Sequence, residues 1–251
     1  MKGKPASPNG EQEINYIQRN TSTRCRAIDD FPSLTFKIGT GQTKNDRLWL
    51  TKKKEYYEKI WKNSGQKILR KIEDICGDTF TSTSKEKGIL VLLYKKTAQT
   101  RYGNLKEDNP LEISLYISKT DNTNTTKETL IRMLVHSFIW QQYEFHFRDR
   151  IQTLFEDILA DEYVTSIVTF TVLGRKLGRT NCTKALNQAI EETVYRLTQK
   201  QTQNKLVDLL YCFSQEEKTK NKKRQDILEH REELVLKLLT FLPKNINIEA
   251  E

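Results

Sequence analysis

The polar residues best suited to metal binding or proton transfer lie inside an apolar segment, residues 129–140, which reads TLIRMLVHSFIW. His136 could bind a metal or transfer a proton, as histidines commonly do. Arg132 precedes it by four positions, so the two side chains would share one face of a helix. Arg132 has no lone pair to offer a metal, and Met133 cannot accept a proton. This spacing predicts one metal ligand at most and no hydrolytic centre.

The same segment resembles the core helix of the SprT-like zinc metallopeptidases, a zincin family that reads T-L-[IL]-H-E-x-x-H-[AS]-x-x-W at this point. In that motif two histidines bind Zn²⁺, and the glutamate acts as general base on the metal-bound water. Arg132 stands at the first histidine and Met133 at the glutamate, while His136 matches the second histidine. The resemblance therefore implies a degenerate motif and a pseudoenzyme.

The resemblance extends upstream of the motif. Tyr102 and Gly103, followed by the segment 111–115, resemble the strand and loop that lead to the zinc-binding helix in this family. The similarity covers residues 65–165 of the 251. It implies a zincin-like fold, and, because SprT-like proteins often act on DNA-bound substrates, proximity to nucleic acid.

Two interpretations of His136 and one of Arg132 stay open. His136 could be a core histidine satisfied by hydrogen bonds, or one ligand of a reduced metal site in which His146 takes the place that the family gives to its third ligand. In addition, Arg132 could pair with Glu156, Asp157 or Asp161 of the following helix, and this ion pair would replace the metal. The residues that could complete the site are His146, Glu156, Asp157 and Asp161. We expect no bound metal and no cofactor.

The hydrophobic pattern predicts a small sheet among helices. Residues 111–117 alternate apolar and polar side chains, which predicts a half-buried strand, and 89–94 form a second apolar strand. The helices expected from apolar spacing are 50–76, 127–145, 150–172, 183–213 and 225–242, and the β-branched end of 150–172 could instead be a strand. The helix at 127–145 is apolar around most of its circumference and should be buried.

The fold class is therefore α+β, with a small mixed sheet flanked by helices and a helical C-terminal extension. We divide the chain into an extended, partly disordered arm at 1–45, a degenerate zincin-like domain at 46–180, and a helical extension at 181–251. The arm is rich in Pro, Gly, Ser, Thr and Asn, a composition that disfavours a packed core.

The net charge of +9 and the sequence pI of about 9.2 favour polyanionic partners. Residues 44–71 contain ten Lys or Arg and three acids, interleaved with aromatic rings. Lysines can contact phosphates while aromatic rings stack on bases, so this stretch is a candidate interface for DNA or RNA. Its candidate residues are Lys52, Lys53, Lys54, Lys59, Lys62, Lys67, Arg70, Lys71, Trp49 and Tyr56. A solvated lysine face is the alternative.

These observations favour a non-catalytic binding or structural subunit of a nucleoprotein or multi-subunit assembly, with protein partners and a DNA or RNA contact. We expect no membrane partner, since no apolar run approaches 18 residues, and a cytoplasmic location or one inside a virus or phage particle, since no secretory signal is evident. Two alternatives remain: an active zinc metallopeptidase with unconventional ligands, and a phage or virus structural component without a nucleic-acid role.

Overall fold

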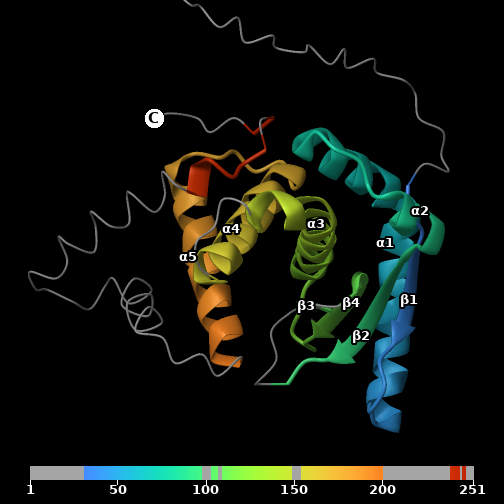
Figure 1. Ribbon diagram of the computed structural model, residues 1–251. Coiled ribbons are helices and arrows are strands. Elements are labelled where there is room, and N and C mark those ends of the chain that lie inside the picture. The colour runs from blue at the N-terminus through green and yellow to red at the C-terminus, as the bar shows by residue number, and fades with distance from the viewer. Residues whose placement is uncertain are drawn as a thin grey trace, which may run out of the picture.

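The fold is α+β, with a small mixed sheet flanked by helices (Figure 1). The computed structural model describes residues 31–97, 103–106, 109–148, 154–199, 238–243 and 245–246. Within them lie β1 (Leu34–Ile38), α1 (Lys44–Cys76), α2 (Ser82–Lys87), β2 (Ile89–Lys95), β3 (Gly103–Lys106), β4 (Asn109–Ile117), α3 (Thr123–Arg148), α4 (Leu154–Val172) and α5 (Arg179–Gln199).

The sheet has the strand order β1-β2-β4-β3. Strands β1, β2 and β4 are parallel, and β3 adds an antiparallel edge to β4. Val91 pairs with both Phe36 and Ile113, so these three side chains point to the same face of the sheet, and all are buried. The alternation predicted for 111–117 is confirmed, because Ile113, Leu115 and Ile117 are buried while the intervening residues are half-buried.

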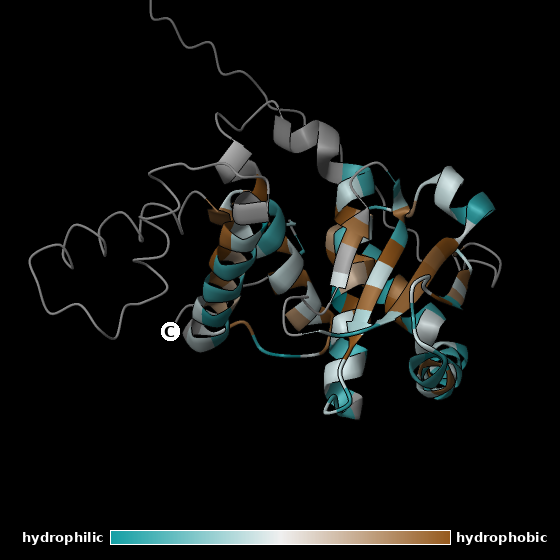
Figure 2. Cartoon of the chain, turned by 90° about the horizontal axis from the view of Figure 1, so that it is seen from below, coloured by the Kyte–Doolittle hydropathy of each residue, from teal (hydrophilic) through white to brown (hydrophobic). Residues whose placement is uncertain are grey.

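Helices α1 and α3 cover this apolar face. The Tyr57 ring of α1 stacks on Phe36 of β1, with 5.8 Å between ring centroids. A Cβ built on Gly103 of β3 would lie only 2.5 Å from the Met133 sulfur of α3, which shows how closely this helix approaches the edge strand. Figure 2 shows hydrophobic residues, in brown, concentrated in the strands, and hydrophilic residues, in teal, on the outer turns of the helices.

Helix α3 lies at the centre of the core, as predicted. Leu130, Leu134 and Phe138 have no exposed surface, and neither do Leu159 and Val164 of the neighbouring helix α4. A helix buried on all sides needs apolar residues around its circumference, as the sequence of α3 has. Helix α4 packs on α3, and α5 packs on α4, farther from the sheet (Figure 1).

Several predicted boundaries differ from the structure. Helix α1 begins at Lys44 rather than 50, because the Thr43 side chain accepts a hydrogen bond from the Asp46 N–H and caps the helix. Residues 154–172 are helical throughout, so the strand considered for their β-branched end does not form. There the buried packing of α4 outweighs the strand propensity of its β-branched residues.

The arm predicted at 1–45 overlaps a strand of the sheet. Residues 34–38 form β1, whose alternating sequence LTFKI buries Phe36 against the core. Residues 1–30 lie outside the described residues. So do 200–237, which include the second part of the helix predicted at 183–213 and most of the helix predicted at 225–242. Near the end of the chain, Leu238 and Phe241 are buried in the core.

No helix in the described ranges is both long enough and apolar enough to cross a membrane.

Candidate functional site

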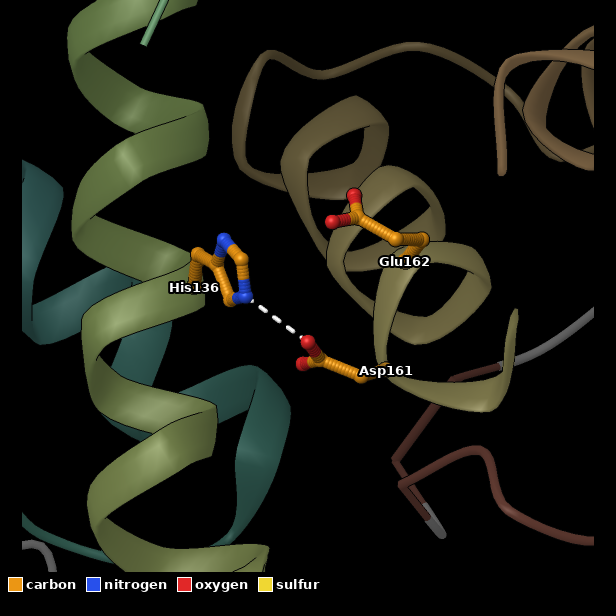
Figure 3. Close-up of side chains that lie close together, drawn as sticks. All are labelled: His136, Asp161 and Glu162. Atoms are coloured by element: carbon orange, nitrogen blue, oxygen red, sulfur yellow. Dashed lines mark hydrogen bonds and ion pairs between the residues drawn. The ribbon is translucent and has the colours of Figure 1, made fainter. Parts of the chain in front are cut away.

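The candidate site is a cluster of charged side chains buried between α3, α4 and α5. Arg132 and His136 lie one turn apart on α3 and point towards α4. Asp161 and Glu162 are consecutive residues of α4 and face them, as Figure 3 shows for His136 and the two carboxylates. Arg196 of α5 reaches the same carboxylates from the other side. We call these five residues the charged cluster.

Each carboxylate of the charged cluster has two cationic neighbours. Glu162 accepts a hydrogen bond of 2.6 Å from Arg132 and one of 3.2 Å from Arg196. Asp161 lies 2.7 Å from the His136 Nε2 and 3.2 Å from the Arg196 Nη1. Hydrogen bonds between charged groups are the strongest kind, and in a buried site they fix the orientation of every partner.

The outer members extend this network. The second guanidinium nitrogen of Arg132 donates to the Ser166 hydroxyl at 3.1 Å, and that hydroxyl donates to the Glu162 carbonyl one turn earlier in α4. Arg196 lies over the Trp140 ring, 5.9 Å from its centroid, and Trp140 also contacts the His136 ring edge-on. Both arginines are therefore held in defined positions.

The network shifts the pKa values of its members. Burial alone would lower the pKa of His136, but the nearby Asp161 carboxylate outweighs burial and raises it above 6.5. Burial alone would raise the pKa of Asp161, but His136 and Arg196 outweigh it and hold that pKa below 3.8. Both shifts favour the charged forms of His136 and Asp161.

His136, Asp161 and Glu162 are the one metal-compatible trio among the described residues, with donor atoms all within 4.8 Å of one another. The surroundings do not fit a divalent cation, however. The two arginines already bind three of the four carboxylate oxygens. A guanidinium about 4 Å from a dication would be repelled by about 8 kcal/mol at an effective dielectric constant near 20. One oxygen, Asp161 Oδ1, is buried without a partner, but a single oxygen makes no cation site.

Met133 stands at the position that the resemblance assigns to a general base. Its side chain is buried, and its sulfur packs on Gly103 of the edge strand β3. A thioether accepts no proton at any ordinary pH. The arrangement therefore offers no group at this position to activate a water.

The ion pair predicted between α3 and α4 forms, but with a partner that was not named. Arg132 pairs with Glu162, at 2.6 Å. The reason is helical spacing: Glu162 and Ser166 lie four residues apart on one face of α4, and Arg132 contacts both. The prediction that Arg132 pairs with Asp161 is therefore wrong, since Asp161 binds His136 and Arg196 instead.

The predicted residues His146, Glu156 and Asp157 lie in the helical ranges of α3 and α4, but their side chains are outside the described residues.

Sequence reasoning missed Arg196 and Glu162. Arg196 lies three residues after Thr193 and seven after Ala189, both fully buried on the face that α5 turns to α4. That periodicity places Arg196 on the buried face of α5, and a buried arginine requires an acidic partner. The signal was present, but its use required knowing that α5 packs on α4.

The predicted basic residues lie along α1 and are spatially separate from the charged cluster. Lys52, Lys59, Lys62, Lys67, Arg70 and Lys71 are exposed, whereas Lys53, Lys54, Trp49 and Tyr56 are half-buried.

No family model, no curated protein and no solved structure matches this chain.

Proposed function

We propose that this chain is a degenerate SprT-like protein, a non-catalytic binding or structural subunit of a nucleoprotein or multi-subunit assembly. The observation that carries the proposal is the charged cluster. At the place where the resemblance puts a zinc ion, the guanidinium groups of Arg132 and Arg196 neutralise Asp161 and Glu162.

The charge balance supports this reading. A zinc ion would bring two positive charges to these carboxylates, and the two arginines bring the same charge without a metal. The helix order also supports it, because α3 lies centrally against a small sheet and the next helix supplies the facing carboxylates. A structural ion-pair cluster of this kind joins α3, α4 and α5 and performs no hydrolysis.

The His136, Asp161 and Glu162 trio favours a second candidate, an active zinc metallopeptidase with unconventional ligands. That function would require Arg132 and Arg196 to leave the carboxylates, and a base from elsewhere in place of Met133. Both arginine side chains are mostly buried, with 13% and 19% of their surface exposed, which disfavours such movement.

Restoring the motif tests the proposal. The variant R132H/M133E/R196M would present two histidines at i and i+4, a base, and Glu162 as a third ligand. We expect it to take up about one zinc ion, while the wild type takes up none. The matched control adds H136A to the same three substitutions and should lose the zinc.

Hydrolysis of an unfolded protein such as casein is the second measurement. Wild-type protein that cleaves casein, and stops when a chelator is added, would overturn the proposal in favour of the metallopeptidase. Wild-type protein that remains inactive with added zinc would support it.

A further inference from the structure

The outer face of α1 is a row of positive charge. Lys52, Lys59 and Arg70 follow one another at intervals of seven and eleven residues, each of which returns to within about 20° on a helix of 3.6 residues per turn. All three side chains are exposed. At 1.5 Å per residue, the row from Lys52 to Arg70 is about 27 Å long. The exposed Lys62 and Lys67 flank it on either side.

Acidic residues neutralise little of this row. Of the three acids among residues 44–71, Asp46 binds Lys95 of β2 at 2.8 Å, and Glu58 binds Lys54 at 3.4 Å. Only Glu55 is left. In the described part of the chain, no ion pair includes Lys52, Lys59, Lys62 or Lys67. An ordinary solvated helix face mixes charges of both signs, because i,i+4 pairs stabilise it.

Two aromatic rings border the row. Trp49 and Tyr56 lie seven residues apart on the same side of α1, and both are half-buried, so part of each side chain is exposed to solvent. The Lys53 ammonium lies 5.8 Å from the centroid of the Trp49 ring. Cations along one line with accessible aromatic rings beside them match the two contacts that nucleic acids offer, phosphates and base faces.

The apolar inner face of α1 packs the helix on the sheet, so the exposed basic residues of the outer face are not needed for folding and can bind a partner. Leu50, Leu69 and Ile72 are fully buried and hold the helix against the sheet. The helix ends are also secured, by the Thr43 cap and by Gly77 in the left-handed conformation. The outer face is thus a rigid surface of fixed spacing.

We propose that the outer face of α1, defined by Lys52, Lys59, Lys62, Lys67 and Arg70, binds the phosphate backbone of a nucleic acid. The row of about 27 Å corresponds to about eight nucleotide steps of 3.4 Å. This inference rests on the proposed binding function, for which it names a partner. It does not depend on the charged cluster. A membrane surface fits less well, because in the described residues Leu48 is the one exposed large hydrophobic residue.

The experiment measures binding of the full-length chain to a fluorescein-labelled 20-mer, as single strand and as duplex, from 50 to 300 mM KCl. Four to five phosphate contacts give a slope of log K against log salt of about −3 to −4.5. We expect the triple reversal K52E/K59E/R70E to weaken binding at 100 mM KCl at least about 30-fold and to reduce the slope to about −2 or less in magnitude.

The matched control is K37E/K119E/K184E, which reverses three exposed lysines on other elements and lowers the net charge of +9 by the same six units. We expect this control to keep the wild-type slope and to lose affinity less than about 5-fold. Circular dichroism of both variants verifies that each is folded.

Three results would overturn the inference: equal losses in the two triple variants, wild-type binding that does not depend on salt, or binding to anionic phospholipid vesicles with none to either oligonucleotide. None of them would alter the zinc and casein measurements, so failure of this inference is distinguishable from failure of the proposed function.

Discussion

Replacing Arg132 by methionine should destabilise the protein strongly, because the buried Glu162 carboxylate loses one of its two arginine partners. Methionine keeps most of the side-chain volume, so the change removes the charge and the hydrogen bonds rather than the packing. Breaking one partner of a buried pair costs about 3–5 kcal/mol. Arg196 stays 3.2 Å from Glu162. We therefore expect the free energy of unfolding to fall by about 3 kcal/mol, the lower end of that range.

Chemical denaturation followed by circular dichroism measures this loss. With an m-value of about 2–3 kcal/mol/M in urea, the unfolding midpoint should fall by about 1 M or more. The matched control is R175M. Arg175 pairs with Glu128, but both side chains are about one-third exposed, at 33% and 32%. A pair with that exposure contributes about 1 kcal/mol or less.

The double variant R132M/E162M separates the charge from the packing. Removing both partners leaves no unpaired carboxylate, so the loss should be smaller than the sum of the two single losses by about 2 kcal/mol. If R132M destabilises the protein no more than R175M does, Arg132 is not the buried partner that the charged cluster requires, and the reasoning fails.

Three further predictions follow from the packing and the pKa shifts. The pKa of His136 is raised above 6.5 on folding, so protonated His136 stabilises the fold at low pH and this contribution is lost as the pH rises through the raised value. The stability difference between wild type and H136Q should therefore narrow as the pH rises above 6.5. G39A should lower the free energy of unfolding by about 1–3 kcal/mol, because the new Cβ would clash with the Tyr94 ring, and in a Y94A background most of that loss should disappear. E73A should cost about 1–3 kcal/mol in thermal or chemical unfolding, because it removes the buried acceptor of the Phe80 N–H, and E73Q should cost less.

The elements with a strong period could be predicted from the sequence. The alternation at 111–117 and the all-round apolar character of 127–145 are local signals, and both correspond to observed elements, β4 and α3. The pairing across α3 and α4 was also expected in kind, since a buried arginine needs a carboxylate. Its partner could not be identified, because the sequence alone does not show which acid of α4 faces Arg132.

Features that depend on tertiary contacts could not be predicted. The five residues of β1 lie in a polar segment. They form a strand because Phe36 stacks on Tyr57 of α1 and pairs with Val91 of β2. Arg196 enters the charged cluster only because α5 folds back on α4. The alternation of β1 is too short to identify the strand beforehand, and the period that places Arg196 on the buried face of α5 does not identify the helix on which α5 packs.

The most direct test of the central claim is the zinc content of the wild-type chain, measured by elemental analysis after incubation with excess zinc and removal of unbound metal. If Arg132 and Arg196 occupy the carboxylates in place of a metal, the protein should hold less than about one-tenth of an equivalent, and H136A should hold the same. One equivalent of zinc in the wild type, lost in H136A, would contradict the account.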